Sequence, residues 1–202
     1  MPRLIALLRA INVGGHIVKM DHLRGLFEKA GFASVETFIA SGNVIFETKD
    51  TERAEHTEGS SHGGTERQRQ KTAALETKIE ARLRKALGYD VATFLRTDAE
   101  IADVAAYAPF APAAIKAALA FNIGFLKEKL DAAATRTLTA FTSDFDAFHT
   151  HKREIYWLCK VRQSDSKFSN VKLEKAIGLP CTWRGANTVR KLAAKYPPGK
   201  KG

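Results

Sequence analysis

The order of strands and helices indicated by the sequence is the feature that most constrains the fold of this 202-residue chain. Short apolar runs alternate with segments whose apolar residues recur at i, i+3, i+4 and i+7, the signatures of buried strands and amphipathic helices. In the first half they lie, in chain order, at residues 4–11 (strand), 23–30 (helix), 35–39 and 44–47 (strands), 75–87 (helix) and 91–95 (strand). The order βαββαβ predicts a ferredoxin-like unit.

The second half repeats this order. A capping box at residues 97–100 opens a short helix that we expect to end at Pro109 and Pro112. The repeated segments follow at 118–125 (strand), 128–138 (helix), 145–151 and 154–160 (strands), 171–177 (helix) and 180–183 (strand), with a closing helix around 189–196. We therefore predict an α+β protein of two ferredoxin-like subdomains packed together, plus a C-terminal helix. The first subdomain is expected at 1–96 and the second at 97–202.

Residues 49–72 interrupt the pattern. Between Lys49 and Thr72 the only apolar side chain is Ala54, so the segment has almost nothing to bury in exchange for the entropy lost on ordering. We expect a disordered insert within the first subdomain.

Charge and cysteine content narrow the function classes. A formal net charge of +10 favours an anionic partner, either a small molecule or nucleic acid, although a basic surface can equally serve solubility. The apolar run at residues 4–8 is too short for a signal peptide and no stretch approaches a membrane span, which favours a cytoplasmic protein without a membrane partner. Cys159 and Cys181 form no CxxC pair, and we expect both to be buried and unbridged.

Five segments resemble the bacterial family of proteins with the domain of unknown function DUF1697. They are LLRAINVGG at residues 7–15, the expected helix through residues 20–23, SGNVIF at 41–46, KFSN at 167–170 and NTVRKL at 187–192. The resemblance spans the chain outside 49–72 and implies a cytoplasmic α+β fold, without an established activity. The chain departs from the family pattern at Ala10, where glycine is usual, at His16, where lysine is common, and at residues 185–186, where Asn-Trp usually stands.

Two glycine-bearing turns are expected to meet at one edge of the first sheet. In a ferredoxin-like sheet the end of the first strand lies beside the turn between the second and third strands, and the first helix also begins there. Helix N-termini and glycine backbone can bind anions. The candidate ligand-binding residues are Arg9, Asn12, Gly14, Gly15, Lys19, Ser41, Gly42 and Asn43. The alternative is that the glycines only satisfy turn geometry and the asparagines bond to backbone.

Other candidate sites are weaker. His149 and His151 share one face of a predicted strand, but a third metal ligand is not evident, so no metal is predicted. Basic residues of the last helix, including Lys191 and Lys195, could contact phosphates or form a solvated face. No complete catalytic motif is present, and catalytic residues, cofactor and oligomeric state stay open. The leading hypothesis is a protein that binds an anionic ligand (nucleotide, phosphorylated metabolite or nucleic acid) at the glycine edge; the alternative is an enzyme acting on a phosphorylated small molecule.

Overall fold

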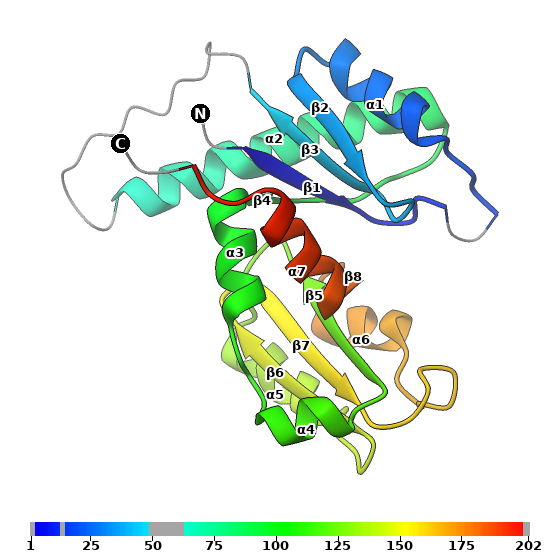
Figure 1. The fold of residues 1–202 in the computed structure, drawn as a ribbon, viewed down its shortest axis with the longest axis vertical. Coiled ribbons are helices and arrows are strands. Elements are labelled where there is room, and N and C mark those ends of the chain that lie inside the picture. The colour runs from blue at the N-terminus through cyan, green and yellow to red at the C-terminus, as the bar shows by residue number, and fades with distance from the viewer. Residues whose placement is uncertain (1–2, 13–14, 49–62, 200–202) are drawn as a thin grey trace. The chain divides into compact units, whose positions relative to one another are not determined.

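The computed structural model describes residues 3–12, 15–48 and 63–199 (Figure 1). The chain divides into two compact units: unit 1, Met1–Asp98 with Pro198–Gly202, and unit 2, Ala99–Pro197. The division falls close to the boundary expected between residues 96 and 97. Each unit is described by itself.

Unit 1 has the predicted βαββαβ order. Its elements are β1 (Leu4–Leu8), α1 (Met20–Lys29), β2 (Ala33–Phe38), β3 (Asn43–Glu47), α2 (Gly63–Leu87) and β4 (Thr93–Thr97). The sheet order is β2-β3-β1-β4 with antiparallel neighbours, as expected for a ferredoxin-like fold. β1 is central because every residue from Ile5 to Leu8 is apolar and buried. The helices cover the face that carries Ala6 and Leu8.

The apolar stripe of each helix explains why it packs there. In α1, Leu23 and Phe27 are four positions apart and both are buried, and Gly31 takes a φ of 93° just beyond the helix end. In α2 the buried stripe is Leu75, Ile79 and Leu83. Both stripes join one core with the sheet.

The expected disorder of 49–72 is wrong for its second part. α2 begins at Gly63, so residues 63–72 are helical, whereas 49–62 lie outside the described residues. The described side chains from Arg67 to Lys71 are exposed, so burial does not hold this turn region in place. Residues 63–72 include Arg, Gln and Lys, which have high intrinsic helix propensity. They extend the helix that the buried stripe of Leu75, Ile79 and Leu83 stabilises.

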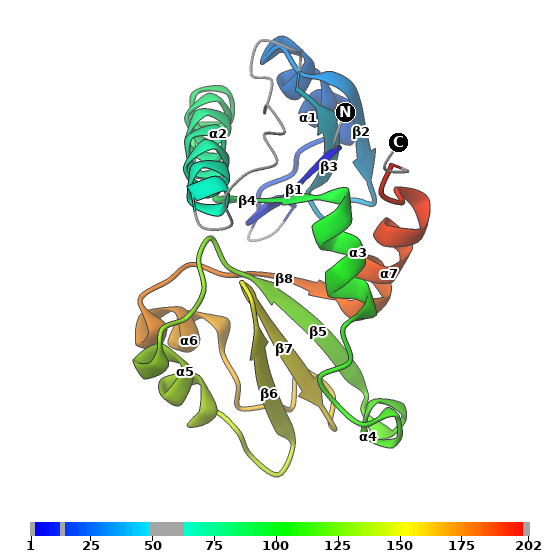
Figure 2. The same cartoon turned by 90° about the vertical axis from the view of Figure 1, so that its left-hand side faces the viewer.

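Unit 2 repeats the topology with different residues. Its elements are α3 (Asp98–Ala106), α4 (Pro112–Ala117), β5 (Ala120–Phe125), α5 (Ala132–Thr139), β6 (Asp146–His151), β7 (Glu154–Cys159), α6 (Asn170–Ile177), β8 (Thr182–Gly185) and α7 (Ala186–Lys195). The sheet order is β6-β7-β5-β8, again antiparallel. α5 and α6 cover one face of this sheet, and α3 and α7 lie on the opposite side (Figure 2). The fold is therefore α+β with two ferredoxin-like subdomains.

One helix was not predicted. α4 begins at Pro112, a residue that was expected only to end the preceding helix. Proline is favourable in the first turn of a helix because the N–H that it lacks would have no intrahelical partner there.

Cys159 and Cys181 are free and buried, as expected. Cys159 ends β7 and Cys181 precedes β8, and the two strands lie on either side of β5. Within the described part of the chain, no helix combines the length and apolar character needed to cross a membrane.

Candidate functional site

The two glycine-bearing turns of unit 1 meet at one sheet edge, as the topology predicts. The Leu8 N–H donates to the Gly42 carbonyl at 2.8 Å, and the Asn12 Nδ2 donates to the Ala40 carbonyl at 3.0 Å. The end of β1 is thereby joined to the β2–β3 turn. We call this region, formed by residues 9–12, 15–19 and 40–43, the glycine edge.

Asn12 connects three segments at this edge. Its Oδ1 accepts a hydrogen bond from the Val18 N–H at 2.6 Å while its amide group contacts the β2–β3 turn. The backbone of Asn12 is left-handed, with a φ of 58°, a conformation that asparagine tolerates better than most residues. Asn12 therefore fixes the path from β1 to the start of α1 and bonds to backbone, as the structural alternative supposed.

Two residues of the β2–β3 turn, Gly42 and Asn43, are buried, whereas Ala40 is exposed. The Asn43 side chain is fully buried and donates to the Phe38 carbonyl at 3.0 Å and to Ser41 Oγ at 2.9 Å. Gly42 has a φ of 73°, and a Cβ there would approach Ile11 Cβ to 3.0 Å. Asn43 and Gly42 thus build the turn, and the Asn43 amide is too deeply placed for direct ligand contact.

The exposed part of the glycine edge lies at the start of α1. Gly15, His16 and Lys19 are exposed, and Gly15 has a φ of 89°. Lys19 is the N-cap residue and makes no side-chain hydrogen bond to the first turn of the helix. N–H groups of a helix's first turn have no intrahelical acceptor and carry partial positive charge. Arg9 is half-buried, and its backbone N–H donates to the Ala92 carbonyl at 2.8 Å. Gly14 lies outside the described residues.

Tyr89 is a residue of this region that the sequence analysis missed. Its ring stacks on His16 with a centroid separation of 3.8 Å, and burial raises the pKa of its hydroxyl. The hydroxyl is buried without a hydrogen-bond partner among the described residues. The only local signal was its position after Gly88, whose φ of 82° ends α2.

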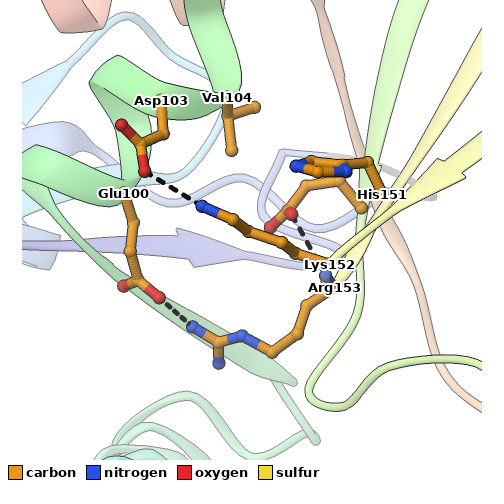
Figure 3. Close-up of a pocket in the computed structure, with 7 residues that line it drawn as sticks. Glu100, Asp103, Val104, His151, Lys152 and Arg153 are labelled. Carbon is orange, nitrogen blue, oxygen red and sulfur yellow. Dashed lines mark hydrogen bonds and ion pairs between the residues drawn. The ribbon is translucent and has the colours of Figure 1, made fainter. Parts of the chain in front are cut away.

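Unit 2 contains a small cavity of about 70 Å³ between α3 and the β6–β7 hairpin (Figure 3). Two ion pairs bridge its walls: Lys152 Nζ to Asp103 Oδ2 at 3.0 Å, and Arg153 to Glu100. Ligand pockets usually measure several hundred Å³. The charged groups of this cavity bind one another, so we assign it to the attachment of α3 to the hairpin.

His149 and His151 share a face of β6, as predicted, and both meet Tyr107. The Tyr107 hydroxyl lies 2.8 Å from His149 Nε2, and the Tyr107 ring stacks on His151 at 3.9 Å. Burial, with a smaller contribution from the charge of His151, lowers the pKa of His149. No cluster of three or more potential metal ligands occurs in the described ranges. The pair is accounted for by aromatic packing.

The chain is similar to known bacterial proteins in fold and in sequence. A structure of a conserved bacterial protein from Streptococcus pneumoniae matches with a TM-score of 0.68 and 21% sequence identity, covering 97% of this chain and 98% of the other; at this identity the match shows the fold alone. No match was found among curated proteins. Residues 1–62 and 65–156 match the family described as protein of unknown function (DUF1697). The chain therefore belongs to the DUF1697 family.

Proposed function

We propose that this protein binds an anionic ligand at the glycine edge of unit 1. The ligand class is a nucleotide, a phosphorylated metabolite or nucleic acid, as expected from the excess of basic residues. The observation that carries the proposal is the start of α1, where a lysine occupies the N-cap position and supplies no acceptor to the first-turn N–H groups.

The equivalent helix of unit 2 supports this assignment. α5 also follows the first strand of its sheet, but its N-cap residue is Asp131, whose Oδ1 accepts a hydrogen bond from the Ala134 N–H at 2.7 Å. At that helix a carboxylate of the protein already satisfies the first turn. α1 has a cation in the same position, and an external anion can take the place of the carboxylate.

The residues of the glycine edge divide into two roles. Lys19 and Gly15 are exposed and are proposed to contact the ligand, with Arg9 adding positive charge from β1's end. The other four residues, Asn12, Ser41, Gly42 and Asn43, are proposed to hold the turns in place. Their hydrogen bonds and close packing join the two turns to each other and to the start of α1.

Asp21 lies in the first turn of α1 and is the local charge that opposes an anion. Its Oδ1 is 3.4 Å from Arg24 Nη2, so a neighbouring cation offsets its charge. The cations and N–H donors around the helix start favour the binding of an anion. The alternative, an enzyme acting on a phosphorylated small molecule, would in addition need a positioned base or nucleophile.

Two lysines at opposite ends of α1 provide a matched test. Calorimetric titration with inorganic phosphate, ATP and a short single-stranded RNA would identify the anion, and the tightest binder would then be measured against Lys19→Ala and Lys29→Ala. Lys29 is also exposed but lies in the last turn, where the helix dipole disfavours anions. We expect Lys19→Ala to weaken binding roughly tenfold, about 1.4 kcal/mol, and Lys29→Ala to leave it unchanged.

The salt dependence of the affinity would separate the ligand classes. A steep loss with salt indicates a polyanion that contacts many phosphates, whereas a shallow loss indicates a small ligand. If Lys191→Ala/Lys195→Ala weakens binding and Lys19→Ala does not, the site lies on α7 and the proposal is wrong. Absence of binding to all three probes would also contradict it.

A further inference from the structure

Three of the four described sheet edges carry features that block pairing with another strand. On β4, the outward N–H groups of Thr93 and Leu95 donate to carboxylates of α2, Glu80 and Glu76, each at 2.8 Å. β8 is only four residues long, and the Cys181 N–H before it donates to Glu174 of α6 at 2.7 Å. Such covered or shortened edges are the usual protection against association through sheets.

The β2 edge is protected by irregularity. Its register against β3 shifts between Ala33 and Glu36, and Ser34 within the shift has a left-handed φ of 50°. A bulge of this kind twists an edge away from a flat partner, and the exposed Glu36 adds a charge.

β6 has neither protection. All six of its residues pair with β7 in one unbroken register. The Lys160 N–H donates to the Phe145 carbonyl, so the antiparallel alternation directs the backbone groups of Ala147, His149 and His151 toward β7. The N–H and C=O groups of Asp146, Phe148 and Thr150 therefore point outward.

Only two of these three residues offer outward groups for pairing. Ser143 occupies both backbone groups of Asp146. The Asp146 N–H donates to Ser143 Oγ at 3.0 Å, and the Ser143 N–H donates to the Asp146 carbonyl at 2.9 Å. No other described group bonds to the outward backbone of Phe148 or Thr150. Within unit 2, β7 is the only described strand that pairs with β6, and α5 packs beside β6 (Figure 2).

The edge strand is also packed against the core of unit 2. The Phe148 ring packs against Phe168 at 5.0 Å and Trp157 at 6.2 Å between centroids, which anchors the middle of β6 to the core. Just before β6, Phe145 exposes 53% of its surface.

We propose that β6 is a dimerisation edge that pairs antiparallel with β6 of a second copy of the chain. One register uses every open group: Phe148 of each copy lies opposite Thr150 of the other, which makes four backbone hydrogen bonds and places the two His149 residues on the two-fold axis. Two features of β6 limit this ladder. Ser143 already binds the backbone of Asp146 at one end, and Lys152 turns the chain with a φ of 52° at the other. This self-complementarity favours a second copy over an unrelated peptide.

A proline substitution tests the pairing without touching the fold. The Thr150 N–H is not used within unit 2, so Thr150→Pro should leave the monomer folded, as prolines are accepted on strand edges. We expect sedimentation velocity from micromolar to millimolar protein to show dimer formation for the wild type and Thr150→Val, and at least a tenfold weaker association for Thr150→Pro. A wild type that stays monomeric throughout, or a Thr150→Pro variant that dimerises equally, would overturn the proposal.

A crosslink tests the register and remains informative if Thr150→Pro fails to fold. Residues facing each other across a non-hydrogen-bonded antiparallel pair have Cα atoms about 4.5 Å apart, within disulfide range. Mild oxidation of His149→Cys should therefore give a covalent dimer bridged at position 149. Ala147→Cys is the control, because the two copies of position 147 would lie about 14 Å apart. Equal crosslinking of both variants, or none for His149→Cys, would refute this register.

Discussion

The N-termini of α1 and α5 occupy the same place in two subdomains of the same topology, yet they are completed differently. α5 has an aspartate cap that accepts a first-turn N–H, whereas α1 has a lysine at the cap position and no side-chain bond. The difference shows that the same fold can satisfy the first-turn N–H groups of a helix with a side chain of the protein or leave them without a side-chain acceptor. This contrast, more than the glycines, is the reason for proposing the binding site in unit 1.

At the last strand of each sheet, by contrast, the two units satisfy an outward backbone N–H group in the same way. Glutamates of the helix that precedes this strand accept the N–H groups. They are Glu76 and Glu80 of α2 at β4, and Glu174 of α6 beside β8. Because these carboxylates come from unrelated sequence contexts, the shared requirement is physical: a buried N–H without an acceptor is costly.

The largest expected effect tests this shared device. Glu76 is 2% exposed, and Glu76→Ala would leave the Leu95 N–H buried without this acceptor, so we expect a loss of about 2–3 kcal/mol in unfolding free energy by urea denaturation. Glu174→Ala should cost less, since Glu174 is only half-buried. Equal losses would mean that the burial of the glutamate does not determine how much its hydrogen bond to the strand contributes to stability.

Next in size is a comparison of two glycines with the same backbone angle. Gly42 and Gly178 have φ values of 73° and 72°, but only Gly42 has neighbours where a Cβ would be placed, at 3.0 Å from Ile11 and 3.2 Å from Leu8. Gly178→Ala should cost about 1 kcal/mol from the left-handed conformation alone. Gly42→Ala should cost roughly 2–3 kcal/mol, because the close contact adds to it. The two losses would be measured by thermal or urea unfolding, and a similar loss for both would show that the turn can shift to make room.

Exchanging the caps would break the comparison between α1 and α5 directly. Asp131→Ala should destabilise the protein by about 1 kcal/mol. Lys19→Asp should stabilise it by about 0.5–1 kcal/mol, because a carboxylate then accepts the open N–H groups and interacts favourably with the helix dipole. The same variant should abolish anion binding in the titration. If Lys19→Asp increased the stability and left anion binding unchanged, the ligand site would not lie at the start of α1.

A smaller gain is expected at the end of β1. Ala10 has a φ of 61°, in the region where glycine is favoured, and glycine is the residue that the family resemblance leads one to expect. Ala10→Gly should raise the unfolding free energy by about 0.5 kcal/mol, the relief of strain less the added entropy of the unfolded chain. A measured destabilisation would indicate that the alanine methyl group contributes contacts that outweigh the strain.

The smallest effect belongs to unit 2 and depends on pH. Because burial lowers the pKa of His149 from its usual 6.5, the unfolded chain takes up the proton more readily; stability is complete above about pH 6.5 and falls as the pH drops through the lowered value. His149→Phe should reduce this loss between pH 7.5 and 5, measured by thermal unfolding at low protein concentration. Tyr107→Phe, which removes the 2.8 Å hydrogen bond but keeps the histidine, is the control and should retain the pH dependence.

Local pattern was sufficient for most of the secondary structure. The positions of strands and helices follow from side-chain periodicity, and their order implies the strand order, because few topologies accommodate βαββαβ. The pattern failed where neighbours rather than periodicity decide: the first turns of α2 propagate from a helix nucleated elsewhere, and Pro112 begins a helix instead of ending one.

The candidate site divides in the same way. The sequence placed Asn12, Gly15, Ser41 and Gly42 at one edge, because topology alone brings the end of β1 to the β2–β3 turn. It could not determine that Asn43 points into the core, that Tyr89 stacks on His16, or that the N-cap of α1 is a lysine without a side-chain bond. Element order depends on local periodicity, which a sequence displays directly, whereas side-chain direction and hydrogen-bond satisfaction depend on atoms brought together from distant segments, and only the tertiary structure settles them.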